Sequence, residues 1–65
     1  MKLVVNGLER EVPDGSTVAS LLKLEREPVK HVLVEINGVY LPAGQYDRTL
    51  QEGDRVEIIL PAFGG

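Results

Sequence analysis

The sequence predicts an α+β fold in which a mixed sheet of four to five strands carries one main helix on one face. Two Asn-Gly pairs, Asn6-Gly7 and Asn37-Gly38, each stand between short apolar runs, which is the strongest short signal for a β-hairpin. Between these two pairs lies one stretch with apolar residues at helical spacing, and an alternating strand follows near the end. We therefore expect a hairpin, a helix, a second strand pair and a final strand.

The first hairpin pairs residues 2–5 with residues 8–12 across its Asn-Gly turn. In the second of these runs apolar and charged residues alternate, so that Leu8, Arg10 and Val12 share one face and two glutamates share the other. That pattern is typical of an edge strand with one side in water.

The helix is predicted to begin after a Pro-Asp-Gly break. Ser16 or Thr17 can cap it by accepting a backbone N–H bond. The helix extends to about Arg26, because Pro28 disfavours helical geometry at the residue before it. One stripe of apolar residues has the i, i+3, i+4 spacing of a single helical face: Val18, Leu21 and Leu22. We expect this stripe to pack on the sheet.

The second strand pair joins residues 31–36 to residues 39–41 around the second Asn-Gly turn. The residues of this pair that share one apolar face are Val32, Val34 and Ile36. Residues 43–50 have no clean period and are predicted as a loop with room for a single helical turn, with Tyr46 and Leu50 packing beneath it.

The last predicted strand, residues 55–60, follows a Gly-Asp turn and alternates again, with Val56, Ile58 and Leu60 inward. The first and last strands can lie side by side in the centre of one sheet, and short right-handed connections then place the helix on one face. This arrangement is a β-grasp, or ubiquitin-like, fold, and periodicity alone does not choose between it and other small α+β arrangements. We expect residues 1–60 to form the domain and residues 61–65 to form a flexible tail.

Composition excludes several classes of function. The 65 residues leave room for one modest core, and the absence of cysteine excludes disulfides and thiolate zinc sites. The net charge is −3, and the basic residues are scattered, so no cationic stripe for nucleic acid exists. Neither a membrane span nor a signal peptide is apparent, so we expect a soluble, cytoplasmic protein.

No group of side chains predicts catalysis. His31 has no second histidine or carboxylate at metal spacing, and Ser16 and Thr17 have no histidine to activate them. Tyr40 and Tyr46 are interpreted as packing residues whose hydroxyl groups are exposed to solvent. We therefore expect no catalytic residue, no metal and no cofactor in this chain.

The candidate functional segment is the tail. Pro61 stops the last strand, and the side chains that follow are small except for one aromatic ring: Ala62, Phe63, Gly64 and Gly65. With no Cβ on the two glycines, the walls of another protein's active site can close on the backbone. The Gly65 carboxylate then becomes the group offered for covalent chemistry, while Phe63 either anchors in a partner pocket or folds back on the sheet.

The whole chain resembles the sulfur carriers of the ThiS/MoaD family, and it is most similar to those of thiamine thiazole synthesis. The motifs that carry the resemblance are Thr17-Val18 with Leu21-Leu22, Ile36-Asn37-Gly38 with Leu41-Pro42, the block from Glu52 to Ile58, and Gly64-Gly65. The Pro-containing ending, in contrast, is similar to that of the small subunit of molybdopterin synthase.

The resemblance implies that Gly65 is converted to an acyl adenylate and then to a thiocarboxylate. A ubiquitin-activating-like, ATP-using adenylyltransferase (ThiF-like) would activate the tail, and a thiazole synthase (ThiG-like) or another acceptor enzyme would receive the sulfur. Pro61, Ala62, Phe63 and Gly64 would form the segment that the partners bind. The carrier would be a cosubstrate and not an enzyme.

Three classes of function stay open at this point. The first is a sulfur carrier, with thiazole formation preferred over molybdopterin synthesis or transfer-RNA thiolation. The second is a ubiquitin-like modifier joined to other proteins through Gly65. The third is a plain β-grasp module that binds a partner through its sheet without covalent chemistry.

Overall fold

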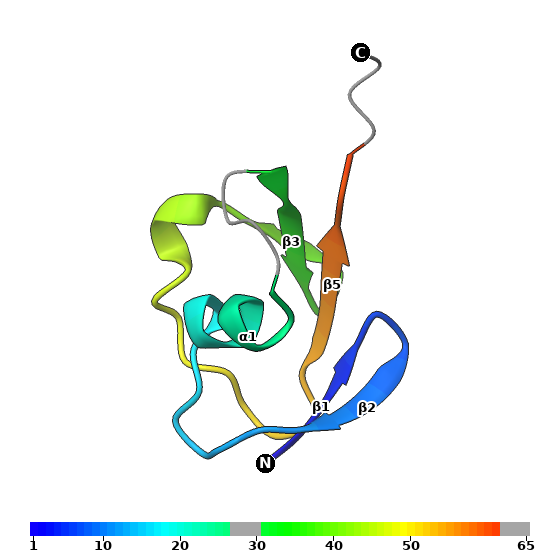
Figure 1. Cartoon of the computed structure of the whole chain (residues 1–65), viewed down its shortest axis with the longest axis vertical. Helices are drawn as coiled ribbons and strands as arrows, with labels where there is room; N and C mark the ends of the chain where they lie inside the picture. The colour runs from blue at the N-terminus through cyan, green and yellow to red at the C-terminus, as the bar shows by residue number, and fades with distance from the viewer. Residues whose placement is uncertain (27–30, 62–65) are drawn as a thin grey trace.

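One mixed five-stranded sheet and one helix make up the fold, in the sheet order β2-β1-β5-β3-β4. The computed structural model describes residues 1–26 and 31–61. In chain order, its elements are β1 (Lys2–Val5), β2 (Leu8–Glu11), α1 (Val18–Leu24), β3 (Leu33–Ile36), β4 (Val39–Leu41), a 3₁₀ turn η2 (Ala43–Gln45) and β5 (Arg55–Ile59). β5 is parallel to β1 and antiparallel to β3. The predicted β-grasp architecture is thus confirmed (Figure 1).

Both hairpin turns have the backbone that Asn-Gly pairs favour. Asn6 and Asn37 have φ of 50° and 52°, and the glycine after each has φ of 82°. Each asparagine also holds β5 through its side chain: Asn6 Oδ1 accepts from the Ile58 N–H at 2.8 Å, and Asn37 Oδ1 accepts from the Arg55 N–H at 2.9 Å. The turns therefore fix the central strand as well as their own hairpins.

Helix α1 begins with a reciprocal cap. Thr17 Oγ1 accepts from the Ser20 N–H at 3.1 Å, and Ser20 Oγ accepts from the Thr17 N–H at 2.8 Å. The N–H groups of Val18 and Ala19 donate to carbonyls of Arg48 and Tyr46. Thr17 is thus the cap, whereas the Ser16 hydroxyl donates to the Pro13 carbonyl at 2.6 Å.

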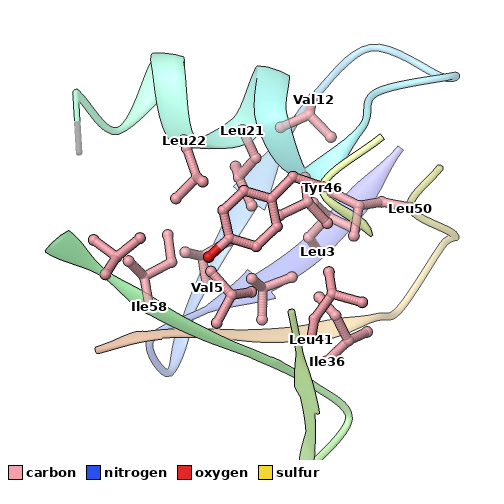
Figure 2. Close-up of a cluster of buried hydrophobic side chains, with 14 residues drawn as sticks. Leu3, Val5, Val12, Leu21, Leu22, Ile36, Leu41, Tyr46, Leu50 and Ile58 are labelled. Atoms are coloured by element: carbon pink, nitrogen blue, oxygen red, sulfur yellow. The ribbon is translucent and has the colours of Figure 1, made fainter. Parts of the chain in front are cut away.

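The core lies between α1 and one face of the sheet. The predicted helical stripe of Val18, Leu21 and Leu22 is fully buried, and it faces side chains from β1, β3 and β5. Figure 2 shows the Tyr46 ring among these side chains, with Leu21 and Leu22 on one side and Leu3 and Val5 on the other. Tyr46 is 6% exposed and Leu50 is 2% exposed, which confirms that the loop after β4 packs inward.

Several predicted boundaries were wrong by one or two residues. α1 ends at Leu24 and not near Arg26, because Arg26 adopts a left-handed backbone with φ of 57°. β3 begins at Leu33 and not at residue 31, and β2 ends at Glu11, after which Val12 turns into the core. Pro28, on which the helix prediction relied, lies outside the described residues.

Some side chains are also more exposed than the sequence predicts. β5 ends at Ile59, so Leu60 is not an inward strand residue and is 57% exposed. Tyr40 is exposed on β4, so it is not a packing residue. β2 is an edge strand as predicted, and its residues are all exposed because the helix does not cover them. Arg10 instead reaches Glu25 at the end of α1, with an N–O distance of 2.9 Å.

The buried tyrosine gives the fold a dependence on alkaline pH. Burial raises the pKa of the Tyr46 hydroxyl above its usual value, and Tyr40 adds to the shift. Above about pH 10 the unfolded chain therefore loses the tyrosine proton more readily than the folded chain, and the free energy of unfolding falls as the pH rises. Between neutral pH and pH values above about 10, we expect the free energy of unfolding of Tyr46→Phe to fall less than that of the wild type.

Urea denaturation at several pH values measures this difference. Tyr40→Phe is the comparison variant, because it keeps the burial of Tyr46 and removes only the smaller contribution of Tyr40, so it should keep most of the wild-type pH slope. Equal slopes for Tyr46→Phe and the wild type would contradict the assignment.

Candidate functional site

The predicted site is the tail that follows β5. Of its five residues, Pro61 lies within the described part of the chain and is half-buried. The four others, Ala62, Phe63, Gly64 and Gly65, lie outside the described residues. The structure therefore defines the base from which the tail departs.

That base is the central strand of the sheet. β5 buries Val56 and Ile58 in the core and forms ladders with β1 on one side and β3 on the other. The β1 ladder ends at Val5 and Val56, while the β3 ladder continues to Leu33 and Ile59. In Figure 1, β5 and the segment to Pro61 run toward the end of the molecule farthest from the N terminus. The tail thus starts from a firmly held strand.

Exposed apolar side chains surround the end of β5. Leu33 and Ile59 are cross-strand partners with exposed fractions of 42% and 40%, and Leu60 follows directly. We call Leu33, Ile59 and Leu60 the exit patch. Exposed apolar groups beside a functional segment are typical of protein interaction surfaces. Three exposed apolar side chains thus lie where the tail begins.

Sequence reasoning missed the exit patch. Leu60 was assigned to the core, and the outward positions of the two strands were not considered as a set. One signal was available: Leu33 and Ile59 are apolar at positions whose side chains alternate away from the buried face. Their pairing depends on the register between β3 and β5, which brings together two residues 26 positions apart in the sequence (59 − 33).

The described residues contain no group arranged for catalysis. The hydroxyls of Ser16 and Thr17 serve the turn before α1 and its cap, and His31 is exposed. Within residues 1–26 and 31–61, no set of three or more metal-binding side chains gathers, and no pocket opens. In the same ranges, no helix is long and apolar enough to cross a membrane.

A family model covers nearly the whole chain. The ThiS family model matches residues 3–65, from the first strand through the tail. The chain belongs to the ThiS family. The resemblance seen in the sequence motifs is thereby confirmed.

Two solved structures with ThiS-like folds are similar to this chain. A crystal structure of the thiamine biosynthesis protein ThiS from Geobacter metallireducens is 37% identical, with a TM-score of 0.81 and full coverage of both chains. A solution structure of a thiamine biosynthesis protein from the same organism is 33% identical, with a TM-score of 0.77, and the match covers 100% of this chain and 88% of that one. Among curated proteins, none matches this ThiS-family chain significantly.

Proposed function

We propose that this protein is a sulfur carrier of thiamine biosynthesis, whose Gly65 carboxylate is adenylated and then converted to a thiocarboxylate. The observation that carries this proposal is the ThiS-family match, which includes the tail through Gly65. The similarity to two thiamine biosynthesis proteins favours thiazole formation as the pathway. The protein is then a cosubstrate that other enzymes modify.

The chemistry of the tail explains why ATP is needed. A carboxylate resists attack by sulfur because the leaving group would be oxide. When a carboxylate oxygen of Gly65 attacks the α-phosphate of ATP, pyrophosphate leaves and an acyl adenylate forms. A sulfur nucleophile then attacks the carbonyl carbon, and AMP leaves. If that nucleophile is a persulfide, a second thiol of the partner attacks the sulfur that is bonded to the partner, forms a disulfide within the partner and releases the thiocarboxylate.

The fold suits this role because it holds the base of the tail and leaves the chemistry to partners. Pro61 ends the strand, Ala62 and Gly64 keep the segment narrow, and Phe63 supplies one ring for a partner pocket. The body, residues 1–60, and the tail, residues 61–65, thus have separate tasks. The exit patch gives partners an apolar surface at the junction.

The proposed scheme requires two enzymes as partners. An ATP-using adenylyltransferase of the ubiquitin-activating type (ThiF-like) forms the adenylate, and a thiazole synthase (ThiG-like) receives the sulfur. Any nucleotide or metal belongs to those enzymes, so this chain needs no cofactor of its own. We place the reactions in the cytoplasm, where ATP and reduced sulfur donors are available.

The intact mass of the protein purified from its native cells tests the proposal. We expect a species heavier than the unmodified chain by the difference between one sulfur and one oxygen atom, with fragmentation placing the difference on Gly65. Its abundance should rise when cells grow without thiamine. A ladder of conjugates would indicate a ubiquitin-like modifier instead, and a change tied to molybdopterin demand would indicate the other carrier pathway. An unmodified mass under all of these conditions contradicts the proposal.

A further inference from the structure

The two sides of β5 are held over different lengths on the way to the tail. On the β3 side, cross-strand pairing continues to Leu33 and Ile59, the last residue of the strand. On the β1 side, pairing stops at Val5 and Val56, because the chain then turns back into β2. Figure 1 shows β5 running past this turn. On the β1 side, therefore, no described strand lies beside residues 57–59.

The side chain of Asn6 takes the place of the missing strand. The Asn6 N–H donates to the Val56 carbonyl at 2.9 Å, and a regular parallel ladder would next join the Ile58 N–H to the Asn6 carbonyl. Asn6 has left the extended conformation, with φ of 50°, and its side-chain oxygen Oδ1 accepts from the Ile58 N–H at 2.8 Å instead. Within residues 1–26 and 31–61, this hydrogen bond is the one nearest the tail that joins β5 to the first hairpin.

We propose that Asn6 is a positioning residue for the tail. Its side chain fixes the β1 side of β5 at Ile58 and thereby sets the direction in which the tail enters the adenylating enzyme. Asn6 acts in this role through the backbone of β5. The inference rests on the proposed function, because it assigns a residue to the delivery of the same Gly65 carboxylate.

A strand that is held along one edge only can turn about that edge. Without the Asn6 bond, the end of β5 keeps its ladder with β3 and loses its restraint on the opposite side. Ile58 is the last buried residue of β5, and seven positions separate it from Gly65 (65 − 58). In an extended chain of this length, a rotation of about 10° at the base displaces the far end by about 4 Å. Errors of that size at a reacting atom lower the rate of a positioned reaction.

Asparagine suits both tasks at position 6. It adopts positive φ at low cost, so it can open the tight turn, and its short side chain carries a hydrogen-bond acceptor. Glycine would keep the turn and remove the acceptor. Aspartate would keep both, because it tolerates positive φ and its carboxylate oxygen also accepts from an N–H. The two substitutions therefore separate the hydrogen bond from the turn.

The second hairpin provides a matched control. Asn37 also has positive φ before a glycine, and its Oδ1 accepts from the Arg55 N–H at 2.9 Å. Its Nδ2 donates to Asp54 Oδ1 at 3.0 Å. These bonds hold the beginning of β5, at the end of the strand away from the tail. Asn37→Gly thus removes hydrogen bonds from the same strand as Asn6→Gly, but at the end that does not lead into the tail.

ATP–pyrophosphate exchange by the adenylating enzyme, measured against carrier concentration, tests the inference. We expect Asn6→Gly to lower kcat about two- to tenfold, which corresponds to the net free energy of one hydrogen bond. The KM for the carrier should stay near the wild-type value, because the substitution alters the delivery of the tail and not the binding of the body. Asn6→Asp should recover most of the lost kcat, and Asn37→Gly should keep the wild-type kcat.

Amide hydrogen–deuterium exchange provides a readout that needs no enzyme. The Ile58 N–H is the donor in the Asn6 bond, so it should exchange faster in Asn6→Gly than the change in urea stability accounts for. In Asn37→Gly, the Arg55 N–H should show this excess instead. The pair of variants thus shows which end of β5 has been released.

Three outcomes overturn the inference. If the wild type supports no ATP–pyrophosphate exchange, the proposed function fails and this inference fails with it. If the wild type supports that reaction and Asn6→Gly keeps its kcat although the Ile58 N–H is deprotected, the bond has a structural role only, and the proposed function stands. If Asn6→Gly and Asn37→Gly lower kcat equally, the loss follows from stability and not from the position of the tail.

Discussion

Deletion of Gly65 is expected to abolish thiocarboxylate formation and thiamine-dependent growth while leaving the fold intact. The deleted residue carries the carbonyl that accepts sulfur in the proposed reaction, so its loss removes the reacting atom. The body should be unaffected, because the described core is made by residues between Leu3 and Ile58. Complementation of a carrier-deficient strain in medium without thiamine measures function, and urea denaturation measures folding.

A second tail variant controls for the length of the chain. Gly65→Ala keeps the carboxylate and adds one methyl group, so it should form some adenylate, and the loss should be milder than that of the deletion. Full growth of a strain that carries only the Gly65 deletion would contradict every covalent role for the tail. It would then favour a β-grasp module that binds partners without modification.

The largest effect on stability is expected from Leu21→Ala. Leu21 is fully buried between α1 and the sheet, so its truncation leaves a cavity in a core shared by the helix and four strands, β1, β3, β4 and β5. Such substitutions cost about 2–5 kcal/mol. A domain of this size has a free energy of unfolding of about 3–10 kcal/mol, so the variant should lose about half of its stability and unfold at a clearly lower urea concentration.

Leu24→Ala is the control that separates the effect of burial from that of helix propensity. Leu24 lies on the same helix but is 55% exposed, so its truncation leaves no internal cavity. We expect a change within about 0.5 kcal/mol. Urea denaturation of both variants, with equal m values, checks the difference. A similar loss in both would mean that helix propensity, and not burial, decides the effect.

Most of the fold could be predicted from the sequence, because the signals for the turns and for the buried helical face each arise within one short segment. Asn6 and Asn37 can adopt positive φ at low cost, so each Asn-Gly pair marks a turn without reference to the rest of the chain. The spacing of Val18, Leu21 and Leu22 likewise reports one buried helical face. These patterns predicted the element types and their order, and the family motifs then selected the β-grasp topology.

Other features depend on contacts that no short segment specifies. Glu25 follows the last residue of α1, and its side chain is 20% exposed because it pairs with Arg10 of β2, a contact that the pattern of the helix does not indicate. The alternation that placed Leu60 in the core was real, but β5 ends at Ile59 and the residue after it is exposed.

The sequence by itself determined the two tight turns and the buried stripe of the helix, and it predicts a narrow tail that ends in Gly64-Gly65. Only the tertiary structure decided that Leu33 meets Ile59 and that Glu35 meets Glu57 on an uncovered face. Periodicity shows which residues share a side of one strand, because it follows from backbone geometry. Which residues stand opposite one another depends on the register between distant strands, and that is fixed by the packing of the whole core.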